Sequence, residues 1–286
     1  MYEDILLPYD GSDGAAAVLH HASEIAHWAD ATVHVLFVAD TTRDSVTVVE
    51  GRTVDALVQQ GEDVVEEATK TLDTLGVDYT STVLQGNPAP TIVEYADETD
   101  QDLVVMPTHG REGISGQLIG SVTEKVVRLS SVPVLAARMQ PDEELAFPYE
   151  DVLIPTDGSP AATEAVRHGL SLASTLDATV HALSVTDDTS LLPDFGGDEI
   201  DDAAATEAID DLVAAADDYD VPEIVRHVEQ GDPAERIREC IEANDVDVVV
   251  MGTTGRRGTD RILLGSVAEK TVRSAPVPVI TVGKSD

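Results

Sequence analysis

The residues best suited to hold a ligand lie in a glycine-rich segment near the end of the chain. Residues 252–266 read GTTGRRGTDRILLGS, and the Gly-Ser pair stands directly before a helical pattern at 266–274. Glycine lets the backbone approach a ligand closely. A helix N-terminus offers unpaired N–H groups and the positive end of the helix dipole, which suit phosphate. The segment therefore favours phosphate binding, with simple helix initiation by Gly265 and Ser266 as the alternative.

Positive charge gathers around the same segment. Five of the 17 basic residues of the chain lie within residues 251–273: Arg256, Arg257, Arg261, Lys270 and Arg273. The chain contains no G-x-x-x-x-G-K-[ST] motif, which argues against a P-loop nucleotide hydrolase, and no G-x-G-x-x-G fingerprint of dinucleotide binding. The S-G-G-x-D-S loop of ATP pyrophosphatases is also absent. If the segment holds phosphate, it does so without the lysine of a P-loop.

The chain is strongly acidic. Its 55 acidic and 17 basic residues give a net charge of −38, and the acids are spread over helical segments rather than gathered in a tail. This charge should destabilise the fold at low salt and indicates a halophilic protein, because repulsion is screened to within about 3 Å at 1 M salt. It argues against nucleic acid as a partner. No long apolar run and no signal peptide are visible, so we expect no membrane contact and a cytoplasmic location.

Few side chains are placed for catalysis or metal binding. The single cysteine, Cys240, excludes an intramolecular disulfide and is expected to be a buried structural thiol. Seven histidines show no spacing typical of metal ligands: His20, His21, His27, His34, His168, His181 and His227. We therefore predict no catalytic residue and no metal site.

The sequence is an internal duplication. DILLPYDGS at 4–12 matches DVLIPTDGS at 151–159 in six of nine positions, and GSVTEKVVR at 120–128 matches GSVAEKTVR at 265–273 in seven of nine. The matching segments follow in the same order in both copies, so each copy is one structural unit. We predict a first domain at 1–139, a linker at 140–149 and a second domain at 150–286.

Within each repeat, apolar β-branched runs alternate with helical patterns. Strands are predicted at 4–8, 32–38, 78–84, 102–106 and 132–137, and at 151–155, 178–185, 223–228, 246–251 and 277–282. Helices are predicted at 12–28, 55–74, 88–97 and 121–129, and at 160–175, 199–217, 233–243 and 266–274. This alternation implies parallel strands joined by right-handed crossovers. The fold class is therefore α/β, with two tandem open three-layer domains.

The helix starts carry capping signals. Asn87 and Asp232 each precede a proline and are predicted to cap the third helix of their repeat. The S-x-x-E patterns at 121–124 and 266–269 fit the capping box, in which the serine is the N-cap residue.

The second repeat resembles the universal stress protein family. Gly252-x2-Gly255-x9-Gly265-Ser266 is similar to the ATP-binding signature of that family, and the P-x-D-G-S segment and the V-P-V final strand also resemble it. The resemblance covers nearly the whole chain as two tandem copies. It implies a five-stranded parallel sheet of order 3-2-1-4-5 in each domain, flanked by helices. It also implies pairing of the two domains through their last strands, and leaves a further homodimer open.

The same resemblance implies a nucleotide site in the second repeat. Asp157 would face the ribose and Val185 the adenine, whereas the residues alone leave Asp157 equally suited to a turn before Ser159. The implied nucleotide-binding residues are Pro155, Thr156, Asp157, Val185, Met251, Gly252, Gly255, Gly265, Ser266 and Val267. The ligand would be ATP or AMP, and Mg²⁺ could bind together with it.

The first repeat departs from this pattern. Pro107 replaces the first glycine of the signature, and Glu112 replaces Arg257. Proline has no N–H and a fixed φ, and the glutamate adds negative charge beside any phosphate. The corresponding site would consist of Asp10, Val38, Gly110, Gly120 and Ser121, and it is predicted to bind nucleotide much more weakly.

Three functions fit these observations. The first is an adenine-nucleotide-binding regulatory protein of the stress response with little or no turnover, hence not an enzyme. The second is a slow ATPase, which would need a base near the γ-phosphate and a metal-binding carboxylate. The third is a dimerising scaffold without nucleotide. Of the three, we expect the nucleotide-binding regulatory protein.

Overall fold

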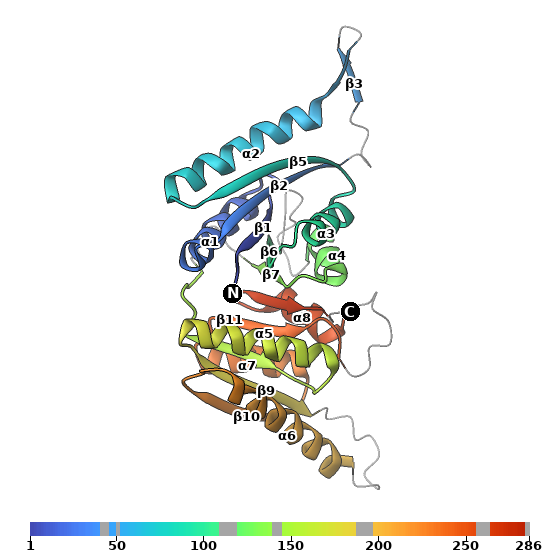
Figure 1. Ribbon diagram of the computed structural model, residues 1–286. Helices are drawn as coiled ribbons and strands as arrows, with labels where there is room; N and C mark the ends of the chain where they lie inside the picture. Colours follow the sequence, from blue (N-terminus) through green and yellow to red (C-terminus); the bar gives the residue numbers. More distant parts are fainter. Residues whose placement is uncertain are drawn as a thin grey trace. The chain divides into compact units, whose positions relative to one another are not determined.

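The chain folds into two compact units, residues 2–144 and 145–286, called here the first and second domains (Figure 1). The structure is a computed structural model that describes residues 1–40, 46–49, 52–108, 119–138, 145–186, 197–255 and 264–283. Each domain is described by itself.

The first domain is a parallel sheet covered by helices on both faces. Its strands are β1 (Asp4–Pro8), β2 (Thr32–Asp40), β5 (Tyr79–Gly86), β6 (Leu103–Pro107) and β7 (Val134–Ala137), in the order β5-β2-β1-β6-β7. The helices are α1 (Asp13–Ala29), α2 (Ala56–Leu75), α3 (Pro88–Glu98) and α4 (Ser121–Leu129). Helices α1 and α2 pack together, as do α3 and α4, and Figure 1 shows the two pairs on opposite faces of the sheet.

The second domain repeats this arrangement. Its strands are β8 (Asp151–Pro155), β9 (Thr179–Thr186), β10 (Ile224–Gln230), β11 (Val248–Gly252) and β12 (Val279–Val282), in the order β10-β9-β8-β11-β12. The helices are α5 (Pro160–Leu176), α6 (Gly197–Ala215), α7 (Pro233–Ala243) and α8 (Ser266–Ser274), with a short 3₁₀ turn at Ala216–Asp218. In chain order both sheets read 3-2-1-4-5, so the predicted fold class and strand order are confirmed.

Burial explains why the middle strands are continuous apolar runs. All five residues of β6 are buried, and so are the first four of β11, because helices cover both sides of the sheet. The edge strands β5 and β10 are only partly buried and carry polar residues. How completely a strand is buried therefore indicates whether it lies in the middle or at the edge of the sheet.

The first helix of each domain is held by the same two devices. Ser12 and Ser159 are the N-cap residues, and their side chains accept hydrogen bonds from the Ala15 and Ala162 N–H groups. Both helices end at an aspartate in the left-handed region, Asp30 with φ 55° and Asp177 with φ 57°. The duplication therefore preserves local backbone geometry.

One prediction about local structure was wrong, and one element was missed. The N-cap residues of α4 and α8 are Gly120 and Gly265, and neither helix begins with a side-chain cap. The serine of each expected capping box is instead the first helical residue. The reason is that the glycine N–H groups donate to the carbonyls of Thr108 and Thr253, at 2.7 and 2.8 Å, which fixes each glycine in the cap position.

The second error was an omission. The hairpin of β3 (Val46–Val49) and β4 (Arg52–Asp55) is antiparallel and was not predicted. The prediction for the third helices holds, since Asn87 and Asp232 are their N-cap residues. Only Asp232 caps with its side chain, which accepts from the Ala234 and Glu235 N–H groups.

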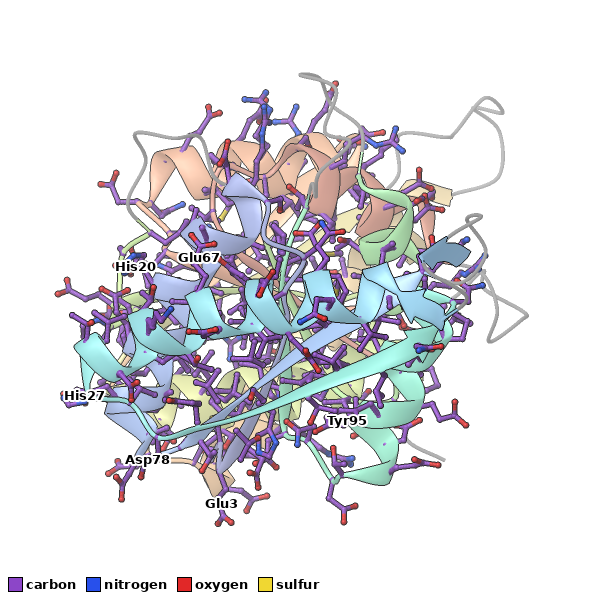
Figure 2. The ribbon with its side chains drawn as sticks, turned by 90° about the horizontal axis from the view of Figure 1, so that it is seen from above. Glu3, His20, His27, Glu67, Asp78 and Tyr95 are labelled. Carbon is purple, nitrogen blue, oxygen red and sulfur yellow. The ribbon has the colours of Figure 1, made fainter. Side chains whose placement is uncertain are left out.

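The surface of the first domain carries its acidic residues outward. Figure 2 shows Glu3, Glu67 and Asp78 projecting from the ribbon, and all three are exposed. Among the helices of the described residues, none combines the length and apolarity needed to cross a membrane.

Candidate functional site

A cavity of about 640 Å³ lies at the carboxyl ends of β8, β9 and β11 in the second domain. Its volume falls within the range of roughly 300–1,000 Å³ usual for small-molecule sites. From β8 the chain continues to β9 on one side of the sheet and later forms β11 on the other side of β8. This is the switch point at which open α/β sheets bind ligands.

The cavity brings together every residue predicted for the nucleotide site of the second repeat. Its lining includes Pro155, Thr156, Asp157, Val185, Met251, Gly252, Gly255, Gly265, Ser266 and Val267. These residues come from the ends of three strands, the glycine segment and the first turn of α8. The spatial grouping agrees with the prediction, while the role of each residue stays a proposal.

The three glycines of the signature lie close to their neighbours, and packing requires a glycine most strictly at Gly252. A Cβ at Gly252 would lie 2.8 Å from the carbonyl carbon of Ala161, in the backbone of the first turn of α5. A Cβ at Gly255 would lie 2.7 Å from the Asp157 carboxylate, and one at Gly265 would lie 3.1 Å from the carbonyl oxygen of Thr253. The glycines thus let the loop lie close against the end of β8 and the start of α5.

Asp157 shapes the turn at the cavity wall. Its Oδ1 accepts a hydrogen bond from the Ser159 N–H at 3.0 Å, so the turn-forming role is observed. Its Oδ2 faces Gly255. The Ser159 hydroxyl accepts from the Ala162 N–H at 3.3 Å and donates to the Thr254 carbonyl at 3.4 Å. The turn after β8 and the glycine segment are therefore joined directly.

A single ion pair of the described residues borders the cavity beside α8. Lys270 Nζ lies 2.9 Å from Asp232 Oδ2, and both residues line the cavity. Their hydrogen bond raises the pKa of Lys270 and, as its largest cause, lowers the pKa of Asp232, so both are charged near neutral pH. Arg256, Arg257 and Arg261 lie outside the described residues. The pair leaves Lys270 within reach of a ligand at the start of α8.

One part of the cavity wall carries no ionisable side chain. It is lined by Leu183, Ser184, Val185 and Thr186 of β9 and by Ala204 and Ala205 of α6. None of these side chains ionises. Sequence reasoning identified only Val185 here, and comparison of the two repeats residue by residue would have shown the small side chain at position 184.

The first domain places larger residues at the equivalent positions. The Tyr9 N–H donates to the Leu36 carbonyl at 2.9 Å, just as the Thr156 N–H donates to the Leu183 carbonyl at 2.8 Å. Tyr9 is therefore the counterpart of Thr156, and it is 5% exposed. Burial, with Glu67 and Asp10 nearby, raises the pKa of Tyr9. The first domain thus has a larger buried side chain where the second has Thr156 in its cavity wall.

The predicted residues of the doubtful first-repeat site are placed similarly in the backbone. Asp10 Oδ1 accepts from the Ser12 N–H at 3.0 Å, the same turn as at Asp157. Val38 lies on β2, and Gly120 and Ser121 begin α4. Gly110 and Glu112 lie outside the described residues. Pro107 ends β6 where Gly252 ends β11.

The structure also joins histidines that are far apart in sequence. His181 Nε2 lies 2.9 Å from Asp151 Oδ1, and its Nδ1 lies 3.1 Å from His227 Nε2. In the first domain His34 likewise bonds Asp4, and its other ring nitrogen bonds Thr80, whose register position corresponds to Val225 rather than to His227. These side-chain hydrogen bonds join residues of neighbouring strands, so the strand register was needed to identify them. In the parts of the chain that the structure describes, no group of three His, Cys, Asp or Glu residues could hold a metal ion.

Cys240 is buried on α7, as expected from the sequence. Burial, the largest cause, raises the pKa of its thiol to about 11. The thiol is therefore protonated near neutral pH and unreactive.

Comparison with known proteins gives one consistent result. The model of the universal stress protein family matches residues 1–138 and again residues 148–283. A universal stress protein of Methanocaldococcus jannaschii is 38% identical over 142 residues, covering 48% of this chain and 83% of its own length. One from Mycobacterium tuberculosis is 31% identical over 215 residues, covering 72% of this chain and 69% of its own length.

A solved structure extends the likeness in fold to the whole chain. The universal stress protein of Archaeoglobus fulgidus has a TM-score of 0.75 at 22% identity, covering 99% of this chain and 97% of its own. At this identity the comparison concerns the fold alone.

Proposed function

Because the chain belongs to the universal stress protein family, we propose that it is a regulatory protein of the stress response that binds an adenine nucleotide, ATP or AMP, in its second domain. The observation that carries the proposal is the cavity of about 640 Å³, whose lining includes all ten residues of the expected nucleotide site. The nucleotide is held with little or no turnover, so the protein acts as a binding protein and not as an enzyme.

The chemistry of the cavity suits an anionic ligand at one end. Helix α8 directs the N–H groups of its first turn toward the cavity at Ser266 and Val267, and a helix N-terminus favours phosphate. The Ser266 hydroxyl makes no hydrogen bond to another described residue and is not a cap, so it can donate to a phosphate. Lys270 adds the nearest described positive charge.

Little turnover is proposed because the carboxylates on the cavity wall already have structural roles. Asp157 closes the turn after β8, and Asp232 caps α7 and pairs with Lys270. A γ-phosphate hydrolase would need a carboxylate that holds a metal or orients water. If ATP is the ligand, Mg²⁺ would arrive on its phosphates rather than in a protein cage.

The remaining expectations form part of the same proposal. The two domains pair within one chain, with a further homodimer as an alternative assembly, and the protein acts in a salty cytoplasm without nucleic acid or membrane partners. The net charge of −38 supports the halophilic part of this proposal.

The test is to purify the full chain in high salt, denature it and identify released small molecules by mass spectrometry. An adenine nucleotide near one per chain supports the proposal. Added nucleotide at about 100 times its dissociation constant should also stabilise the binding domain by roughly 2.7 kcal/mol. Phosphate released steadily from ATP over hours would favour the slow ATPase. No released nucleotide and no stabilisation would favour the scaffold.

A further inference from the structure

Different parts of the second-domain cavity wall differ in chemistry, and this difference can orient a nucleotide. One part is formed by the described residues of the glycine segment, the start of α8 and Lys270, which suit phosphate. Another part, formed by β9 and α6, carries small or apolar uncharged side chains. A nucleotide is anionic at one end and carries an uncharged planar base at the other. The base therefore belongs between β9 and α6.

Residue 184 in this part of the wall has an aromatic counterpart in the first domain. Ser184 follows Leu183 on β9 and lines the cavity. Phe37 follows Leu36, and Leu36 and Leu183 accept equivalent hydrogen bonds from Tyr9 and Thr156. The two positions therefore correspond.

The helix that faces this position shows a matching exchange. Helix α2 packs on β2 and helix α6 packs on β9. Gly61 is a buried residue of α2 that lies against Phe37, and Ala205 is a buried residue of α6 that lines the cavity together with Ser184. The first domain thus has Phe37 and Gly61 between this strand and its helix, and the second domain has Ser184 and Ala205.

The Phe37 ring fills its place completely. It is 6% exposed. A Cβ at Gly61 would lie 2.5 Å from Phe37 Cδ1 and 2.8 Å from Phe37 Cε1, so glycine is needed to admit the ring. The same Cβ would lie 3.0 Å from Val83 Cγ1 on β5, which closes the space from the side. Serine and alanine are smaller than this ring, and in the second domain Ser184 and Ala205 both line the cavity.

We propose that this position determines which domain accepts the base of a nucleotide. Ser184 leaves a recess between β9 and α6 that takes the adenine ring, and Phe37 occupies the equivalent space in the first domain. This inference rests on the proposed function, since it names the specificity-determining residue of that site. Tyr9 is the counterpart of Thr156 in the cavity wall, and its larger side chain also disfavours a base in the first domain.

The test moves the first-domain pair into the second domain of the full chain. The double variant Ser184→Phe/Ala205→Gly supplies both the ring and the glycine on which it packs. Ala208→Gly is the control, because it introduces a glycine at a buried residue of the same helix that does not line the cavity. AMP binding is measured by calorimetry in high salt. We expect Ala208→Gly to bind like the parent and the double variant to lose affinity by about tenfold or more, because the base is no longer buried.

The outcomes separate this inference from the proposed function. If the parent chain binds no adenine nucleotide, the proposed function fails and the inference fails with it. If the parent and the double variant bind AMP equally, the inference is overturned while the proposed function stands. Circular dichroism and thermal melting without ligand establish that the double variant folds. Should it not fold, Ser184→Leu places a smaller side chain in the recess and carries the same expectation.

Discussion

The two domains share a backbone and differ in what fills the carboxyl edge of their sheets. Strand order, the serine caps of α1 and α5 and the turns at Asp10 and Asp157 are the same in both. The side chains at the edge are not. The first domain has Tyr9, Phe37 and Pro107, and the second has Thr156, Ser184 and Gly252. The two copies therefore share one scaffold and differ in the size of the side chains at this edge.

The difference at the end of the fourth strand is steric as well as chemical. Gly252 lies so close to the first turn of α5 that a Cβ would meet backbone atoms of Ala161 and Ala162 at 2.8–2.9 Å. Pro107 already has a Cβ, so the first domain must place α1 differently against β6. The proline thus marks a different packing of the first helix against the fourth strand, beyond the loss of one N–H donor.

Substitution of Gly252 should have the largest effect on this comparison. Gly252→Val forces α5 away from β11, and we expect nucleotide binding to be lost. Overpacking of this kind usually costs about 1–3 kcal/mol of stability. Calorimetric titration and thermal melting in high salt measure both effects. Pro107→Val is the control, because that position already accommodates a Cβ, and it should leave nucleotide binding unchanged. Parent-like binding by Gly252→Val would show that the close packing does not shape the site.

Lowering the salt should weaken both domains together. Acidic residues outnumber basic ones in each repeat. Reducing salt from about 2 M to 0.1 M lengthens the screening distance from a few Å to roughly 10 Å, so self-repulsion grows. We expect the melting temperature to fall markedly, as followed by circular dichroism across a salt series. An unchanged melting curve would contradict the halophilic part of the proposal.

Acidification should have a smaller effect that is shared by the two domains. His21 and His168 occupy equivalent positions on α1 and α5, and burial lowers the pKa of each to about 4. The unfolded chain, in which histidine has its ordinary pKa near 6.5, then binds protons more readily than the folded chain. Stability is therefore full above about pH 6.5 and falls as the pH drops toward 4.

The measurement is the melting temperature at pH 7 and pH 5 for the parent, His21→Gln and His168→Gln. Each variant should reduce the pH dependence by a similar amount, because glutamine takes up no proton. Unequal reductions would show that the two domains differ in this part of the core as well as at the cavity.

The alternation of strand and helix patterns predicted the parallel sheets, while the strand order and the set of site residues were implied by the family resemblance. Continuous β-branched runs such as 248–251 identify buried strands, and the ends of parallel strands converge at one edge. The capping boxes failed because the hydrogen bonds from Gly120 and Gly265 to distant carbonyls decide the cap. The recess at Ser184 also escaped prediction, since its size depends on which residue of α6 faces β9. That pairing is tertiary and has no signature within a window of sequence.

Calorimetric titration of the full chain with AMP or ATP in high salt tests the central claim most directly. The account predicts about one tight site per chain, which is lost in Asp157→Ala and kept in Asp10→Ala. Both substitutions remove the same turn, so damage to the turn is matched between them. Losing a charge-assisted hydrogen bond costs about 1.5–3 kcal/mol, or roughly 10- to 150-fold in affinity. Two equal sites per chain, or a site lost with Asp10→Ala and kept with Asp157→Ala, would contradict the assignment of the nucleotide to the second domain.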